Sequence, residues 1–343
     1  MHSLKFKNNK LFYLDQTKLP KKEVWRNCST IKSGWKAIKN LKVRGAPLIG
    51  VFAAYCICIH LNKLSPKKTL FLKQLKKSLK YLESARPTAV NLFWALDRLN
   101  KVSLQSKQKE VEKIKKDIVK EAKLIHRQDI MTCKHIANYG VSLIKKNETI
   151  LTHCNTGFLA TSGQGTALGV IFKAKEQGKN PTVYIDETRP LLQGARLTAW
   201  ELNKKKIKSF LITDNSAAFL MQNKQIDKIF VGADRITASG DTANKIGTYN
   251  LAILAKYHNI PFYIVAPWST FDLSLKKGSD IVIEKRGQKE VKEVLGKVII
   301  CPKETKAVNF AFDITPSKLI KAIVTDKGII YPPYKKNIKK LIK

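Results

Sequence analysis

ILTHCNTGFLATSGQGTALGVI, residues 150–171, lies where the pattern of apolar residues along the sequence changes. A short apolar run ends at Cys154, glycine-rich turns follow, and a second apolar run begins, as is typical of a strand that leads into a helix. From residue 149 onward, β-prone runs alternate with helical segments at residues 162–178, 195–204, 215–223 and 243–258. The β-prone runs are TILTHC, TVYID, SFLIT, KIFVG and FYIVA. This alternation predicts a parallel sheet with helices on both faces.

The part of the chain before this point has a different pattern. Apolar residues between positions 65 and 144 recur at helical spacing, and a small β element is expected near residues 4–14. At 343 residues the chain is long for one core and comfortable for two domains. We therefore predict an α/β protein with a mainly helical N-terminal domain at residues 1–145 and a parallel-sheet domain at residues 146–343.

The composition shows a large excess of positive charge, with a formal net charge of +38. Only nine of the 64 basic residues are arginine, and the lysines are spread along the whole chain. Such lysines are typical of solvated helix faces, so we expect nonspecific adhesion to polyanions at low salt but no specific nucleic-acid partner. Five arginines fall within the motifs described below: Arg44, Arg86, Arg189, Arg196 and Arg235.

The location signals point to the cytosol. The first 15 residues lack a continuous apolar block, so no secretory signal is predicted. GAPLIGVFAAYCICIHL, residues 45–61, contains a proline and is shorter than the roughly 20 residues of a membrane-spanning helix, which favours a buried core helix. The six cysteines contain no CxxC pair, a pattern that favours reduced thiols over disulfides or a metal site.

Polar or turn residues follow each of the five predicted strands. They are Cys154, Asp186 with Glu187, Thr213 with Asp214, Asp234, and Pro267. In open α/β sheets, ligands bind beyond the carboxyl ends of the strands. If the five strands are parallel, these residues line one crevice, and the sequence predicts a ligand site there.

The chemistry of this crevice has functional and structural explanations. Cys154 is either a packed core thiol or a reactive thiol at a strand end, before a helix whose dipole favours thiolate. Asp234 follows a buried strand, where an apolar crevice would favour its protonated form; a helix cap or an ion pair with Arg235 is the alternative. Asn244 and Lys245, at the start of the predicted helix 243–258, are placed to bind phosphate with free backbone N–H groups. Glycines 163, 165 and 169 depart from the dinucleotide fingerprint, so no nucleotide cofactor is expected.

Taken in order, several motifs resemble the methylthioribose-1-phosphate isomerase family, a branch of the superfamily of initiation factor 2B α/β/δ subunits. The motifs are VRGAP (43–47), RPTAVNLFWA (86–95), LTHCNTG (151–157), GTALGVI (165–171), DETRPLLQGARLTAWEL (186–202), ITDNSAA (212–218), VGADRI (231–236), GDTANKIGTY (240–249) and AFDITP (311–316). The resemblance spans nearly the whole chain. One departure is Gln164, where the family commonly has tyrosine.

The resemblance implies a cytoplasmic homodimer with a Rossmann-like C-terminal domain that needs neither cofactor nor metal. It implies an aldose–ketose isomerase that converts 5-methylthioribose 1-phosphate to 5-methylthioribulose 1-phosphate in methionine salvage. By motif, Asp234 takes the acid/base role and Cys154 the partner role. The substrate contacts fall to Arg44, Gly45, Ala46, Arg86, Gln193, Asn244 and Lys245.

Two rival functions are compatible with the same motifs. A ribose-1,5-bisphosphate isomerase would share Cys154 and Asp234, but it needs cations where the methylthio group would lie. A noncatalytic regulatory subunit like those of initiation factor 2B would use the crevice to sense a phosphorylated ligand. The presence of both the thiol and the carboxylate argues against the regulatory subunit, whereas assays with the two sugars are needed to distinguish the two isomerases.

Overall fold

The computed structural model describes residues 2–86 and 90–341, and these form two compact units. The first unit contains the chain up to Cys133 together with Phe158–Gly165. The second contains Lys134–Gly157 and the chain from Thr166 onward. The predicted domain division at residue 145 stays a prediction. Residues 87–89 of the predicted RPTAV motif lie outside the described residues.

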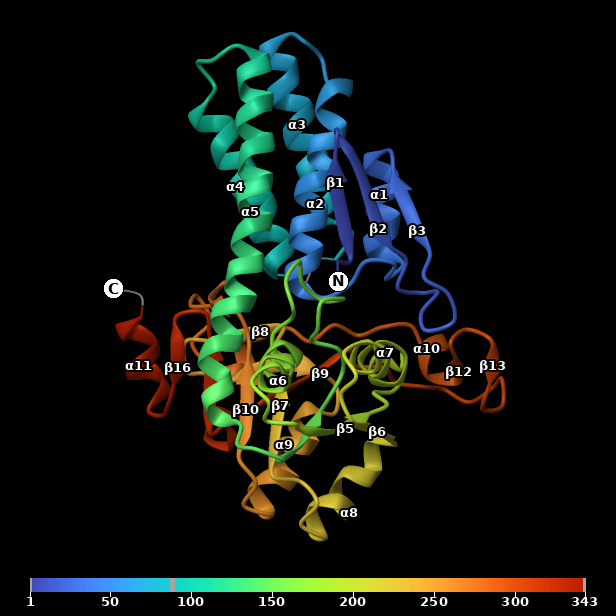
Figure 1. The fold of residues 1–343 in the computed structure, drawn as a ribbon. Coiled ribbons are helices and arrows are strands. Elements are labelled where there is room, and N and C mark those ends of the chain that lie inside the picture. Colours follow the sequence, from blue (N-terminus) through green and yellow to red (C-terminus); the bar gives the residue numbers. More distant parts are fainter. Residues whose placement is uncertain (1, 87–89, 342–343) are drawn as a thin grey trace. The chain divides into compact units, whose positions relative to one another are not determined.

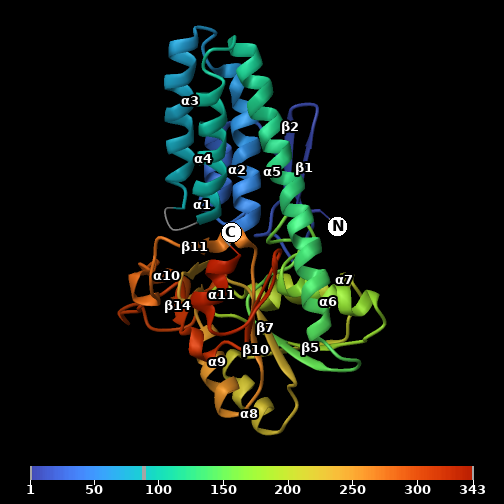
Figure 2. The same cartoon turned by 90° about the vertical axis from the view of Figure 1, so that its left-hand side faces the viewer.

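The first unit combines a small antiparallel sheet with a group of helices (Figures 1 and 2). The sheet, in the order β1-β2-β3, confirms the β element expected near residues 4–14 and adds one strand. The strands are β1 (Leu4–Lys7), β2 (Lys10–Leu14) and β3 (Trp25–Cys28). The helices are α1 (Ile31–Lys39), α2 (Ala46–His60), η1 (Leu61–Lys63), α3 (Lys68–Glu83), α4 (Val90–Gln105) and α5 (Val111–Gly140). The residues of α5 from Lys134 onward belong to the second unit.

Helix α2 forms the core of this unit. Every residue from Leu48 to Cys58 is buried, because the helix is apolar on all sides and α1, α3 and α4 pack around it. The segment Ala46–Lys63 is long and apolar enough to cross a membrane, but 67% of it is buried inside the structure. The prediction of a core helix at residues 45–61 is therefore confirmed.

The segment Phe158–Gly165 is tied to the first unit through Asp129 on α5. The Ser162 N–H donates to the Asp129 carboxylate at 2.6 Å, and the Gln16 side chain donates to the Leu159 carbonyl at 2.7 Å. Burial raises the pKa of Asp129 to about 6, although the hydrogen bond from the Ser162 N–H acts in the opposite direction.

This raised pKa predicts a pH-dependent stability. The unfolded chain binds the Asp129 proton with a pKa of about 4, so the folded state holds the proton more tightly. The resulting stabilisation is complete below about pH 4 and is lost as the pH rises through about 6. We expect Asp129→Asn to remove this loss, measured as the free energy of urea unfolding at pH 4.5 and 7.5. An unchanged pH slope in the variant would contradict this assignment.

The second unit is built on a seven-stranded sheet in the order β16-β15-β10-β7-β4-β5-β6. All neighbours are parallel except β15 and β16, which are antiparallel. The five strands predicted from the sequence all belong to this sheet and are parallel, as expected. The strands are β4 (Thr149–Thr152), β5 (Thr182–Asp186), β6 (Ser209–Ile212), β7 (Lys228–Val231), β10 (Phe262–Val265), β15 (Ala322–Thr325) and β16 (Gly328–Ile330).

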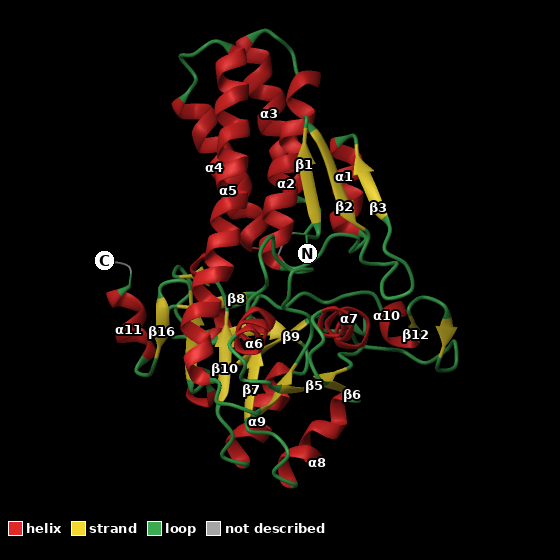
Figure 3. Cartoon of the chain, in the orientation of Figure 1, coloured by secondary structure: helices red, strands yellow, loops and turns green. Residues whose placement is uncertain are grey.

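Helices cover both faces of this sheet (Figure 3). On one face, Ile150 and Phe230 pack in a core with residues of α6 and α7; on the other, Leu151 and Ile229 pack with residues of α8, α9 and α11. Neighbouring strand residues point to opposite faces, so a continuous apolar run such as KIFV fits a strand buried on both sides. The helices are α6 (Ala167–Glu176), α7 (Ala199–Lys204), α8 (Ala217–Gln222), α9 (Thr248–Tyr257) and α11 (Tyr334–Lys340). The α/β fold class is therefore confirmed.

A four-stranded sheet, β11-β8-β9-β14, corrects the prediction of a helix over residues 243–258. Residues Thr242–Lys245 form β9, which pairs antiparallel with β8 on one side and β14 on the other. Helix α9 begins only at Thr248, after Gly247 at φ +104°. Strand pairing on both edges of β9 outweighs the local helical pattern. The strands are β8 (Arg235–Thr237), β9 (Thr242–Lys245), β11 (Phe271–Asp272) and β14 (Phe312–Thr315).

The remaining elements are short connections. They are η2 (Val141–Leu143), η3 (Gly194–Thr198), η4 (Asp214–Ser216), η5 (Trp268–Thr270), η6 (Gly278–Asp280), α10 (Lys289–Lys292), β12 (Glu293–Val294), β13 (Val298–Ile299) and η7 (Ser317–Leu319). Strands β12 and β13 form an antiparallel pair of their own. Among these elements, η3 bears on the site because it follows the carboxyl end of β5.

Candidate active site

Cys154 lies two residues beyond the end of β4, with its backbone in the left-handed region at φ +62°. Its N–H donates to Thr188 Oγ1 at 2.9 Å, and its carbonyl accepts from Thr198 Oγ1 at 2.6 Å. The residue is partly exposed, unlike a packed core thiol. Because α6 begins only at Ala167, Cys154 does not belong to the first turn of that helix. Two threonine hydroxyls therefore hold its backbone.

Asp234 lies three residues beyond the end of β7 and is partly buried. Strand β7 is the parallel neighbour of β4, with Leu151 opposite Ile229. The loops that carry Cys154 and Asp234 therefore leave the sheet at adjacent strand ends. The Asp234 N–H donates to the Ala243 carbonyl at 2.9 Å, which joins this loop to β9.

Gln193 directly precedes η3, a π-helical turn after β5. It is buried, and its amide oxygen has no hydrogen-bond partner among the described residues. A buried acceptor without a partner costs about 1–3 kcal/mol, so a ligand hydroxyl at this oxygen would be favourable. Glycine is required next to it, because a Cβ at Gly194 would lie 1.7 Å from the Asp186 carbonyl oxygen.

Asn244 and Lys245 are buried on β9, not at a helix start as predicted. Asn244 Nδ2 donates to Thr248 Oγ1 at 2.9 Å. Lys245 Nζ donates to the Ala311 carbonyl at 2.6 Å and lies 4.7 Å from the centre of the Phe312 ring. This ammonium thus lies close to an aromatic face, where a ligand anion would be a strong additional partner.

Two of the N–H groups at the start of α9, which we expected to be open to a phosphate, already have an acceptor. The N–H groups of Gly247 and Tyr249 donate to the Asp313 carboxylate at 2.7 and 3.1 Å. Burial raises the pKa of Asp313 to about 6, while these hydrogen bonds and the charges of His153 and Lys245 act to lower it. A carboxylate from β14 thus takes two of the N–H groups at this helix end, and binding of phosphate there stays a prediction.

Four of the predicted substrate-binding residues belong to the first unit. Arg44, Gly45 and Ala46 lie at the start of α2, and Arg86 follows the end of α3. Gly45 has φ +90°, and a Cβ there would lie 2.4 Å from the Ala160 Cα. The Leu48 N–H also donates to the Ala160 carbonyl at 3.1 Å, so the turn before α2 requires glycine and is fixed against residues 158–165. Gln164, which departs from the family pattern, is exposed.

His153 and Asp186 form a buried pair that the sequence analysis did not assign. His153 Nδ1 and Asp186 Oδ2 are 2.8 Å apart, and each side chain is 1% exposed. The sequence did contain a signal for this pair. His153 and Asp186 lie at the ends of two consecutive predicted strands, which the alternation of strands and helices places in one parallel sheet.

This pair also belongs to a group of metal-type ligands, His153, Asp186 and Asp214, whose ligand atoms lie within 4.8 Å of one another. The donor atoms do not fit a metal. Both ring nitrogens of His153 are hydrogen-bonded, to Asp186 and to the Ile246 carbonyl, and the Asp214 carboxylate accepts from the N–H groups of Thr188 and Arg189. The absence of a metal in this protein stays a prediction.

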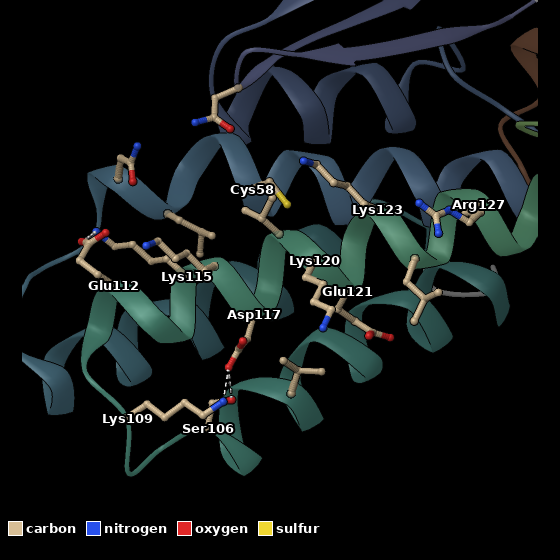
Figure 4. A pocket seen from close by; sticks show the side chains of 17 residues that line it. Cys58, Ser106, Lys109, Glu112, Lys115, Asp117, Lys120, Glu121, Lys123 and Arg127 are labelled. Atoms are coloured by element: carbon tan, nitrogen blue, oxygen red, sulfur yellow. Dashed lines mark hydrogen bonds and ion pairs between the residues drawn. The ribbon is translucent and has the colours of Figure 1, made fainter.

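A cavity of about 960 Å³ lies within the first unit, among residues of α2, α4 and α5 (Figure 4). Its wall carries six basic side chains, but Lys109 pairs with Asp117 and Lys115 pairs with Glu112, each at 2.7 Å. None of the predicted site residues lines this cavity. We assign no function to it.

Comparisons with known proteins agree with this architecture over the full length of the chain. A profile of the initiation factor 2 subunit family matches residues 42–332. The chain is 49% identical to the methylthioribose-1-phosphate isomerase of Caldicellulosiruptor saccharolyticus and 51% identical to that of Acetivibrio thermocellus, and each alignment covers 99% of both chains.

Two crystal structures are similar over nearly the whole chain. The 5-methylthioribose 1-phosphate isomerase from Pyrococcus horikoshii OT3 is 42% identical with a TM-score of 0.92, covering 99% of this chain and 95% of that one. The translation initiation factor eIF-2B, subunit delta, from A. fulgidus is 41% identical with a TM-score of 0.88, covering 100% and 99%.

The chain therefore belongs to the initiation factor 2 subunit family. Within that family it groups with the methylthioribose-1-phosphate isomerases, to which it is about half identical from end to end. The family resemblance found in the motifs is confirmed.

Proposed function

We propose that this chain converts 5-methylthioribose 1-phosphate to 5-methylthioribulose 1-phosphate in methionine salvage. The proposal rests mainly on one observation: over its full length the chain is about half identical in sequence to proteins named methylthioribose-1-phosphate isomerase. The arrangement of Cys154 and Asp234 on the loops after adjacent parallel strands supports it.

The substrate requires an acid before any hydrogen can move. Its anomeric carbon bears phosphate, so no free aldehyde forms by itself. Asp234 donates a proton to the ring oxygen as the bond between that oxygen and C1 breaks. Hydrogen then moves from C2 to C1, and Cys154 acts as the base or stabilises the developing enediol charge. The C2 hydroxyl loses its proton as C2 becomes the ketone, which balances the proton that Asp234 gave to the ring oxygen. Every atom of the substrate is retained, as an isomerisation requires.

The other predicted residues hold the substrate in this proposal. Lys245 supplies a buried positive charge for the phosphate, with Asn244 beside it on β9. The partnerless amide oxygen of Gln193 accepts from a sugar hydroxyl. We assign Arg44, Gly45, Ala46 and Arg86 to substrate binding on their motifs. The planar guanidinium groups of Arg44 and Arg86 suit phosphate oxygens.

A direct assay separates this proposal from its rivals. Phosphorus NMR of the purified protein with methylthioribose 1-phosphate should show the ketose product, and ribose 1,5-bisphosphate in parallel should show much slower conversion. Faster turnover of the bisphosphate would replace the proposed substrate. Because a relative at 41% identity is an initiation factor 2B delta subunit, sugar-phosphate binding without turnover of either compound would favour a regulatory subunit instead.

We also propose a homodimer that works in the cytosol. Exposed apolar side chains on α8 and α9, with Phe219 65%, Ile253 44% and Tyr257 80% exposed, support a protein contact on the second unit. None of the six cysteines forms a disulfide, in keeping with a reducing compartment. A monomeric mass in light scattering would contradict the dimer.

A further inference from the structure

The buried pair of His153 and Asp186 lies between the two segments to which the proposed function assigns chemistry. His153 directly precedes Cys154, and Asp186 is the last residue of β5. Strands β4 and β5 are paired up to Thr152 and Ile185, so the next residue on each strand brings the imidazole to the carboxylate. The contact thus follows from the register of two adjacent parallel strands.

The hydrogen-bond partners of the ring fix where its hydrogens lie. His153 Nε2 is 2.9 Å from the Ile246 carbonyl oxygen, which only accepts, so Nε2 carries a hydrogen and donates it. Nδ1 shares the remaining proton with Asp186 Oδ2 at 2.8 Å. The proton on either atom leaves the pair uncharged overall. Ile246 directly follows Lys245, so the ring joins the Cys154 loop to the end of β9.

The electrostatic surroundings favour keeping this shared proton. Burial raises the pKa of Asp186, and the negative charges of Asp214 and Glu187 act in the same direction. Burial by itself would lower the pKa of His153, but the hydrogen bond and charge of Asp186, with the charge of Asp214, outweigh it and raise that pKa. Asp313 is a further acid whose charge interacts with His153. Asp186 Oδ1 is buried and lacks a hydrogen-bond partner in the described part of the chain, which makes a bare charge there costly.

Two glycines pack closely against this pair, one at the His153 ring and one at the Asp186 backbone. A Cβ at Gly247 would lie 2.9 Å from His153 Cε1, so the α9 start can approach the ring only because residue 247 is glycine. On the other side, Gly194 packs against the Asp186 carbonyl. Asp186 therefore packs against the start of η3, and His153 packs against the start of α9.

From these contacts we propose that His153 and Asp186 are positioning residues, a one-proton, uncharged pair that holds the Cys154 loop in place against the Lys245–Gly247 segment. Neither side chain needs to touch the substrate. The inference rests on the proposed function only for the roles of two residues, Cys154 in the reaction and Lys245 in binding the phosphate. A displacement of about 1 Å at such a residue can lower a rate about a hundredfold, so a positioning pair has a measurable effect on turnover.

Substitutions of Asp186 separate positioning from charge. In Asp186→Asn the amide can donate to Nδ1 of a neutral His153, which keeps its hydrogen on Nε2, so the geometry and the zero charge are both retained. Asp186→Ala leaves Nδ1 without this partner. We expect kcat within about threefold of the unsubstituted protein for Asn and a loss of about 10- to 100-fold for Ala, with smaller changes in KM. Asp227→Ala is the matched control, because that carboxylate binds the Thr149 N–H at the other end of β4.

Two further readouts do not depend on turnover. Proton NMR of ¹⁵N-histidine-labelled protein should show two low-field signals, one from the Nε2 hydrogen of His153 and one from the proton shared with Asp186, both assigned by their loss in His153→Gln. Only the Nε2 signal should remain in Asp186→Asn. The rate at which iodoacetamide alkylates Cys154, followed by mass spectrometry, should change in Asp186→Ala and stay the same in Asp186→Asn.

The outcomes are distinguishable from failure of the proposed function. If Asp186→Asn is as impaired as Asp186→Ala, the charge of Asp186 acts in the reaction and the positioning role is overturned. Unchanged kcat and unchanged alkylation in Asp186→Ala would overturn it as well. If the unsubstituted protein turns over neither sugar, the proposed function fails, while the NMR and alkylation results still decide the role of the pair.

Discussion

Replacing Cys154 by serine should lower kcat about a hundredfold or more, with folding intact. A hydroxyl is a much weaker acid than a thiol, so serine cannot supply the thiolate that the hydrogen transfer uses, while its size and its two backbone hydrogen bonds are retained. The measurement is steady-state turnover of methylthioribose 1-phosphate, with the melting temperature recorded alongside. Cys301→Ser is the matched control, since Cys301 is also a partly exposed free thiol.

Asp234→Asn should also lower kcat about a hundredfold or more. Asparagine matches the shape of aspartate but cannot donate a carboxyl proton to the ring oxygen, so opening of the substrate ring slows. Asp280→Asn, in the 3₁₀ turn η6, serves as the control. Turnover near the unsubstituted rate in both Cys154→Ser and Asp234→Asn would rule out the proposed mechanism.

Lys245→Met should weaken substrate binding about a hundredfold. Truncating one partner of a buried charged pair costs about 2–5 kcal/mol, and a factor of 100 corresponds to about 2.7 kcal/mol. Methionine fills similar space beside Phe312 without the ammonium that now lies 4.7 Å from its ring centre. If Lys245 binds the phosphate equally in the ground and transition states, the substitution should raise KM and leave kcat nearly unchanged.

The control for this substitution is Lys256→Met, an exposed lysine on α9. We expect its KM to stay near that of the unsubstituted protein, which separates a specific contact from the general effect of a strongly basic chain. A KM in Lys245→Met equal to that of the control would show that Lys245 does not bind the phosphate. The assay should be repeated at two salt concentrations, because a buried charge is screened less than a surface charge.

Much of the second unit could be predicted from the sequence. The apolar run before Cys154 and the run KIFV are buried on both faces, and such strands belong in a parallel sheet whose carboxyl ends carry the ligand site. Cys154 and Asp234 are among several residues that follow such runs, and the family motifs selected these two from the group.

Other parts of the candidate site could not be predicted in this way. The TANK segment was expected to begin a helix, but as β9 it pairs with β8 and β14, and β14 lies some 70 residues further along the chain. The same β14 supplies Asp313, which occupies the helix end expected for phosphate. Hydrogen bonds to a distant strand do not appear in local residue patterns.

The amino-acid order alone determined the α/β class and the strands of the parallel sheet, because burial of apolar side chains imposes a period that is local in sequence. The roles proposed for Cys154 and Asp234 came from the family motifs in which they lie. Only the tertiary structure decided the pairing of His153 with Asp186, the strand conformation of Asn244 and Lys245, and the capping of α9 by Asp313. Each of these depends on a hydrogen bond between residues distant in sequence, and such bonds form only after the sheets have brought their partners together.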